Sequence, residues 1–204
     1  MLQLPAISGA VEGPVDEAVL QRLILHSKGI PTMVYGKKGK PHLLKSLAGY
    51  NAAAQRSPWI VLVDLDKDGT CVGPLLGSWL PTPAPYMCFR VAVKAIESWL
   101  IADRETLATF LGVALSKVPQ KPDLEPNPKD TVINLARISR KKNIREGMVP
   151  RPGSGRMVGP LYTSFMIEFT TNHWQPDVAA ANSDSLHRAL NCIQQLISKA
   201  VTTV

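Results

Sequence analysis

Long apolar runs are missing from this sequence of 204 residues. The longest uninterrupted apolar stretches hold about five residues, such as Trp59–Val63, whereas a helix that crosses a bilayer needs about 20. The N-terminus has neither a basic segment nor a continuous apolar segment, so we expect no secretory signal. We therefore expect a cytoplasmic protein that has no membrane partner.

Cysteine is also scarce, with three residues that lie far apart and form no CxxC pair. An odd number of widely spaced cysteines argues against a disulfide framework and against a zinc site. We therefore expect Cys71, Cys88 and Cys192 to be reduced thiols.

The overall composition is that of a globular chain. Apolar residues make up 45% of the sequence and charged residues 19%, which excludes a disordered chain because enough apolar surface is present to form a core. A chain of this length holds one domain of ordinary size, or one domain with a small addition. We assign residues 1–116 to an α/β core and residues 117–204 to a C-terminal extension that packs on it.

Positive charge is concentrated in two segments, at residues 37–45 and 137–156. The net charge is +7, and the segment from Arg137 to Arg156 alone contains seven basic residues and one acidic residue. A basic surface separated from a mildly acidic body is typical of proteins that bind polyanions, although an isolated basic cluster is more often only solvated surface. The residues that we expect to contact nucleic acid are Lys37, Lys38, Lys40, Arg137, Arg140, Lys141, Arg151 and Arg156.

Strands and helices alternate in the first half of the chain. Short apolar segments predict strands at residues 5–11, 31–35, 59–63 and 87–95, and helical patterns follow them at 16–25, 42–54, 72–80 and 96–111. This alternation predicts an α/β fold with an open, mainly parallel sheet flanked by helices. Trp59–Val63 is apolar on both sides, as a central parallel strand should be.

The second half of the chain has a different pattern. A proline-rich loop at residues 117–129 precedes a predicted helix at 130–143, which would place Arg137, Arg140 and Lys141 on one face. The glycine- and proline-rich residues 147–160 predict a mobile loop. Ser183 is an expected N-cap for a last helix, whose apolar residues keep a helical period as far as Ala200.

Acidic residues follow the predicted strands. Glu12 comes after the first strand, and Asp64, Asp66 and Asp68 come after the third. Ligands of parallel α/β sheets bind at the carboxyl ends of strands, and residues i and i+2 of an extended segment point to the same side, so Asp64 and Asp66 should converge. Oxygen ligands favour a hard cation such as Mg²⁺ or Mn²⁺, although such a cluster is also compatible with a solvated turn. Glu97, just beyond the fourth strand, is a further candidate ligand.

Two other motifs compete for the segment Asp64–Thr70. The EF-hand pattern is matched at its first positions, but its last ligand position holds Leu75 and a strand precedes it, so we reject this interpretation. The segment Asp66–Thr70 also fits the DxDGT sequence of haloacid dehalogenase-like phosphatases. In that family the motif lies on the first strand, so a phosphatase is kept only as an alternative.

The segments Gly9–Glu17 and Val61–Asp68 together resemble the Toprim superfamily, which occurs in topoisomerases, primases and overcoming-lysogenisation-defect-type nucleases. The later strings Ala95–Asp103, Asn127–Asp130 and Trp174…Leu186 resemble a small stand-alone bacterial Toprim-like family of unknown function. This resemblance implies that Asp64 and Asp66 hold Mg²⁺ and that Glu12 is a general acid/base or a further ligand. It also implies a bacterial setting, a role in genome defence, and an ATPase as partner.

We therefore expect a Mg²⁺-dependent phosphoryl-transfer enzyme, a nuclease acting on DNA or RNA. The alternatives are a non-catalytic nucleic-acid or partner-binding module and a phosphatase. The expected catalytic residues are Glu12, Asp64 and Asp66, and the expected metal ligands are Glu12, Asp64, Asp66, Asp68 and Glu97. Asp103 lies on an apolar helix face, where a buried carboxylate needs a partner, so we expect it to be structural. The sequence has no Walker-type GxxxxGK[ST] string, which argues against ATP hydrolysis by this chain.

Overall fold

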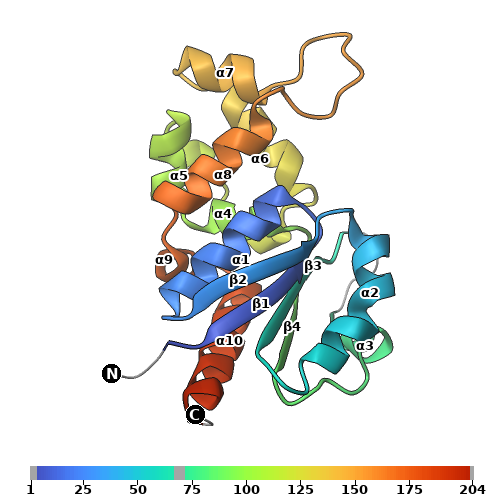
Figure 1. Ribbon diagram of the computed structural model, residues 1–204. Coiled ribbons are helices and arrows are strands. Elements are labelled where there is room, and N and C mark those ends of the chain that lie inside the picture. The colour runs from blue at the N-terminus through green and yellow to red at the C-terminus, as the bar shows by residue number, and fades with distance from the viewer. Residues whose placement is uncertain (1–3, 67–71, 203–204) are drawn as a thin grey trace.

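The fold was analysed in a computed structural model, which describes residues 4–66 and 72–202. Asp68 and Cys71 lie outside the described residues. Strands and helices alternate in the first half, in the order β1 (Ala6–Val11), α1 (Pro14–His26), β2 (Ile30–Gly36), α2 (Lys40–Ala53), β3 (Trp59–Asp64), α3 (Val72–Trp79) and β4 (Met87–Ala92). The strands form one sheet in the order β2-β1-β3-β4, in which every pair is parallel. The prediction of an open parallel α/β fold is confirmed (Figure 1).

The alternating side chains of β3 divide the apolar residues between the two faces of the sheet. Ile60 and Leu62 belong to the large hydrophobic cluster that includes α1, whereas Val61 and Val63 pack with residues of α2. Figure 1 shows α1 on one side of the sheet and α2 and α3 on the other. Because both faces are covered, this central strand is apolar at consecutive positions. Its end, and not its faces, is therefore the part that is open to a ligand.

The second half of the chain is helical. Its elements are α4 (Ile96–Ala102), α5 (Arg104–Leu111), the 3₁₀ turns η1 (Leu115–Lys117) and η2 (Pro122–Leu124), α6 (Pro128–Arg137), α7 (Lys142–Met148), α8 (Tyr162–Asn172), α9 (Pro176–Ala180) and α10 (Asp184–Thr202). One hydrophobic cluster runs from Ile7 of β1 to Ile197 of α10, so the helices and the sheet share a core. No helix within the described ranges combines the length and the apolar character needed to cross a membrane.

Two predicted helices are wrong in extent. The helix expected at 96–111 is broken at Asp103, whose fully buried carboxylate accepts a hydrogen bond from the backbone N–H of Gln175 at 2.8 Å. The helix expected at 130–143 ends at Arg137, because the chain then turns to place the buried Ser139 hydroxyl against the carbonyl of Leu111. Arg137, Arg140 and Lys141 therefore do not share one helix face. The fourth strand also ends earlier than predicted, at Ala92.

The expectation that all three cysteines are reduced thiols is wrong for two of them. Cys88 of β4 and Cys192 of α10 form a disulfide, with their Cα atoms 6.1 Å apart. The two residues are separated by 104 positions in the sequence, and only the packing of α10 against β4 brings them together. Spacing along the chain gave no sign of this pair, because a disulfide depends on geometry in the folded state.

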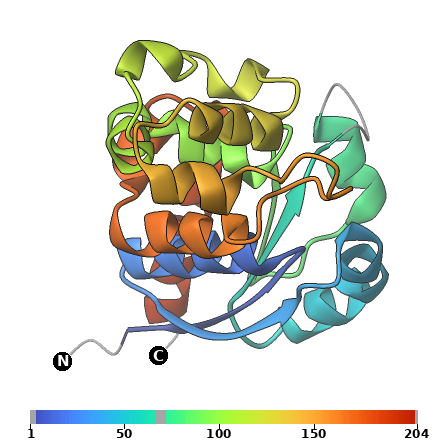
Figure 2. The ribbon, with the colours of Figure 1, turned by 90° about the horizontal axis from the view of Figure 1, so that it is seen from above.

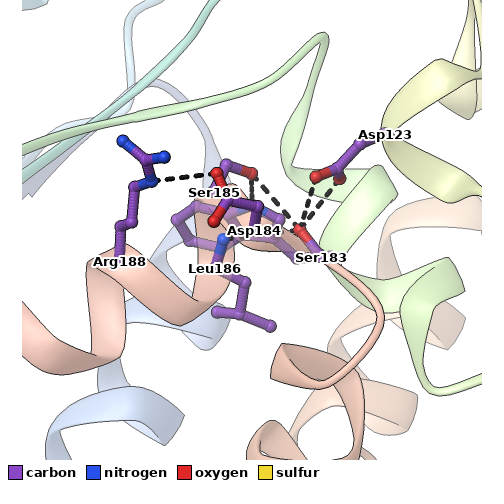
Figure 3. Close-up of polar contacts among 7 residues, drawn as sticks. Asp123, Ser183, Asp184, Ser185, Leu186 and Arg188 are labelled. Atoms are coloured by element: carbon purple, nitrogen blue, oxygen red, sulfur yellow. Dashed lines mark hydrogen bonds and ion pairs between the residues drawn. The ribbon is translucent and has the colours of Figure 1, made fainter.

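A network of polar contacts at the start of α10 joins this helix to η2 (Figure 3). The Ser183 hydroxyl donates to both carboxylate oxygens of Asp123, at 2.8 and 3.0 Å, and accepts from the backbone N–H of Leu186 at 3.3 Å. This confirms Ser183 as the N-cap of the last helix. Burial raises the pKa of Asp123. The indole N–H of Trp99 donates to Ser185 at 2.7 Å, which fixes the same turn against α4.

We expect Asp123→Ala to lower the free energy of unfolding by about 1–2 kcal/mol, because the buried Ser183 hydroxyl would lose its acceptor. The matched control is Asp184→Ala on the same turn, whose side chain is 72% exposed and pairs with Arg188 at 2.9 Å. An exposed ion pair of this kind contributes at most about 1 kcal/mol. Chemical denaturation of the two variants would measure the difference, and equal losses would contradict the role of Asp123.

Candidate functional site

The ends of β1 and β3 meet at the point where the sheet topology reverses direction. The chain passes from β1 outward to β2 on one side, and from β3 outward to β4 on the other. Glu12 follows β1, and its Oε1 accepts a hydrogen bond from the backbone N–H of Asp64 at 2.8 Å, although 52 positions separate the two residues. The expected meeting of these two acidic residues at one sheet edge is therefore seen in the structure. Such switch points are where parallel α/β sheets bind ligands.

Asp64 lines a small pocket together with two further carboxylates. Its Oδ1 accepts from the backbone N–H of Ile96 at 2.8 Å, which fixes the side chain against the start of α4. The pocket has a volume of about 160 Å³ and is lined by Asp16 of α1, Asp64 and Glu97 of α4. The other lining residues are Gly13, Pro14, Val15, Ile96, Lys129, Val158, Tyr162 and Thr163.

Glu97 is buried in this pocket and has two polar partners. Its Oε1 accepts a hydrogen bond from the Tyr162 hydroxyl at 3.1 Å and lies 3.5 Å from Lys129 Nζ. Only 3% of the Glu97 side chain is exposed, compared with 47% for Lys129. The start of α8 and the start of α6 thus both contribute to the pocket. Glu97 lines the same pocket as Asp64. It therefore remains a candidate ligand, as predicted from the sequence.

Burial and mutual repulsion change the titration of these groups. Burial and the nearby Glu97 and Glu12 raise the pKa of Asp16 to about 7. Burial and the nearby Asp16 raise the pKa of Asp64 well above its usual value. Glu97 raises the pKa of Lys129, which stays cationic. Full ionisation of these carboxyls in the pocket is therefore unfavourable, and a bound cation would relieve that cost.

Asp66 has a different environment from Asp64. Its φ of 50° takes the backbone out of the extended region, so the alternation that should have placed both side chains together ends before Asp66. Asp66 Oδ2 lies 2.7 Å from Lys40 Nζ, and the same ammonium is 3.4 Å from the carbonyl oxygen of Leu65. The Lys40 ammonium thus neutralises the negative charge of the Asp66 carboxylate. Asp68, the other expected ligand of this segment, lies outside the described residues.

The predicted nucleic-acid contacts fall into several environments. Lys37 pairs with Glu17 at 3.1 Å, and its neighbour Lys38 is exposed at the same sheet edge. Lys141 donates to the carbonyl oxygens of Thr109 and Phe110 at 3.0 and 2.9 Å, so it binds the C-terminal end of α5.

Arg137 and Arg140 are both exposed near the end of α6. The Arg137 guanidinium donates to the Asn134 side chain of the same helix. The backbone N–H of Arg140 donates to the Gly112 carbonyl at 3.0 Å, which fixes the position of its chain but not of its side chain. Both side chains thus remain at the protein surface.

Arg151 and Arg156 lie on a loop that borders the acidic pocket. The ends of this loop are joined by hydrogen bonds from Gly159 N–H to the Met148 carbonyl, at 2.9 Å, and from Leu161 N–H to the Gly147 carbonyl, at 2.8 Å. The two arginines line a second pocket, of about 440 Å³, and Val158 lines both pockets. Figures 1 and 2 show this loop as a long extension between α7 and α8. A basic surface thus adjoins the acidic one.

The acidic residues suit a hard cation in their chemistry, since all their donors are carboxylate oxygens. Within the part of the chain that the structure describes, however, no three His, Cys, Asp or Glu side chains are already arranged as a metal site. One oxygen each of Glu12 and Asp64 is occupied by a backbone N–H. A cation would therefore share these carboxylates with the backbone hydrogen bonds, and the side chains would need to adjust to bind it together.

Sequence reasoning missed three residues of the pocket: Asp16, Lys129 and Tyr162. Asp16 is predicted only as the first residue of a helix, although it follows Glu12 by four positions and α1 begins two residues after that glutamate. Lys129 belongs to the segment Asn127–Asp130, which the sequence analysis used for the resemblance but not for the site, and no motif near Tyr162 indicates a role for it.

Comparison with protein-family models, with curated proteins and with solved structures gives no match to this chain.

Proposed function

We propose that the protein is a Mg²⁺- or Mn²⁺-dependent phosphoryl-transfer enzyme that cleaves phosphodiester bonds of DNA or RNA. The observation that carries the proposal is the convergence of Glu12, Asp16, Asp64 and Glu97 at the switch point of the sheet, where burial and then mutual repulsion raise the pKa values of Asp16 and Asp64. The arginine loop next to this pocket supports a polyanionic substrate.

In the proposed mechanism, Glu12, Asp64 and Glu97 would hold the cation, and Asp66 would adjoin it at the rim. When bound, the cation supplies neutralisation of the charge on the phosphoryl oxygens. Asp16 has a pKa of about 7, which suits a group that moves a proton to or from an oxygen near neutral pH. Glu12 is the second candidate for that role. Arg151 and Arg156 would bind neighbouring phosphates and orient the chain.

The wider setting is part of the same proposal. The order of Glu12 and the Asp64–Asp66 pair on a parallel sheet supports a Toprim-like relationship, and with it a bacterial cytoplasmic role beside an ATPase partner. The disulfide between Cys88 and Cys192 removes one reason for that location, because reduced thiols were part of the case for the cytoplasm. The proposed location therefore does not draw on the state of these two cysteines.

The test is a cleavage assay on labelled DNA and RNA of the same sequence, with Mg²⁺ or Mn²⁺ and in parallel with EDTA. We expect cleavage that EDTA abolishes. Binding of the oligonucleotides without cleavage would favour the alternative of a non-catalytic binding module. Hydrolysis of a small phosphomonoester instead would favour the phosphatase.

A further inference from the structure

Lys129 is the only cationic residue among the described residues that line the acidic pocket. It is the second residue of α6, where Pro128 begins the helix and fixes the direction of the chain. Its ammonium lies 3.5 Å from Glu97 Oε1, and about half of the side chain (47%) is exposed. The group is thus tied to the pocket on one side and open to solvent on the other.

The surroundings of Lys129 hold it in this position. Glu97 is buried and accepts a second hydrogen bond from Tyr162, so the carboxylate that faces the ammonium cannot easily turn away. An ion pair with one partner leaves two of the three ammonium protons for other acceptors.

A phosphodiester would meet a strongly repulsive pocket without this residue. Asp16, Asp64 and Glu97 all lie on the pocket wall, and a phosphate approaching them carries the same sign of charge. Lys129 offers positive charge within the pocket itself, whereas Arg151 and Arg156 lie in the adjoining one. Val158 lines both pockets, so the pocket that contains Lys129 borders the one lined by the two arginines.

We propose that Lys129 is a substrate-binding residue that contacts the phosphate group at the acidic pocket of a bound phosphodiester chain, with Glu97 and Tyr162 holding it in place. This inference rests on the proposed function. The ligand is identified by its chemistry: a phosphate within a nucleic-acid strand whose neighbouring phosphates reach the arginine loop.

The test compares Lys129→Met with Lys129→Arg and with the control Lys117→Met, which removes an exposed lysine of η1 that does not line the pocket. The probes are labelled single-stranded DNA and RNA oligonucleotides of one sequence, measured by fluorescence anisotropy with Ca²⁺ in place of Mg²⁺. We expect Lys129→Met to weaken binding about tenfold at low salt and to reduce the salt slope by about one unit. Lys129→Arg and Lys117→Met should stay within about twofold of the wild type.

A second measurement separates phosphate binding from a merely structural role. Mn²⁺ binding, followed by calorimetry, should be unchanged or tighter in Lys129→Met, because a positive charge next to the carboxylates has been removed. Weaker binding of both Mn²⁺ and the oligonucleotide would overturn the inference, as would equal oligonucleotide binding by wild type and variant or no binding by the wild type. Failure of the wild type to cleave with Mg²⁺, while the effect of Lys129 on binding persists, would reject the enzyme and keep the phosphate contact.

Discussion

Asp64→Asn is expected to lower the rate of phosphodiester cleavage by at least about a thousandfold and, at the same time, to raise the stability of the protein. The asparagine side chain keeps an oxygen that can accept from Ile96 N–H, the contact that orients Asp64 at 2.8 Å. It removes the negative charge that a cation and the reaction would need. It also removes a charge that burial and Asp16 make unfavourable, as the raised pKa of Asp64 shows.

The combination of the two effects is what identifies a functional carboxylate. Substitution of an aspartate with a purely structural role would lower the stability of the protein, because the hydrogen bonds of that aspartate contribute to the fold. The control is Glu105→Gln, an exposed residue in the first turn of α5 that does not line the acidic pocket, and it should change neither quantity. Cleavage rates and urea denaturation at pH 8 would be measured on both variants. An active Asp64→Asn protein would reject the proposed site.

The fold was largely predictable because local pattern and topology agree in the first half of the chain. A strand such as Trp59–Asp64, apolar at consecutive positions, can only be stable when both faces are covered. Alternation of such strands with helices leaves few topologies. The second half was less predictable, since the breaks at Asp103 and after Arg137 depend on long-range contacts with Gln175 and Leu111. Helical periodicity continues through such positions and does not record the contacts.

The candidate site, like the fold, was predictable only in part. Glu12 and Asp64 could be placed together because each ends a parallel strand, and adjacent parallel strands end at one edge. The left-handed backbone of Asp66, which ends the extended alternation, could not be predicted from the local pattern. Lys129 and Tyr162 reach the pocket from α6 and α8, whose packing on the sheet follows from the whole core. No local pattern carries that information.

The stability of the protein should fall as the pH rises from about 4 to about 7, and a divalent cation should restore it above pH 7. Asp16 has a folded-state pKa of about 7, compared with 3.8 for an ordinary aspartate. A carboxyl whose pKa is raised by folding binds its proton more tightly in the folded state, so its contribution is favourable at low pH and is lost as the pH passes through the folded-state value. At 1.36 kcal/mol per pKa unit, the loss from Asp16 is about 4 kcal/mol. The raised pKa of Asp64 acts in the same direction.

A cation that binds the carboxylates would compete with the protons that otherwise neutralise them. Mg²⁺ or Mn²⁺ at about 100 times its dissociation constant would therefore stabilise the protein by about 3 kcal/mol at pH 8 and by much less at pH 5, where Asp16 and Asp64 retain protons. Urea denaturation at both pH values, with and without the cation and at constant ionic strength, measures the four free energies. In Asp16→Asn and Asp64→Asn the dependence on pH should be weaker, since one titrating group is absent from each. Equal stabilisation by the cation at pH 5 and pH 8 would show that it binds elsewhere, because a cation in the acidic pocket must compete with the protons on Asp16 and Asp64.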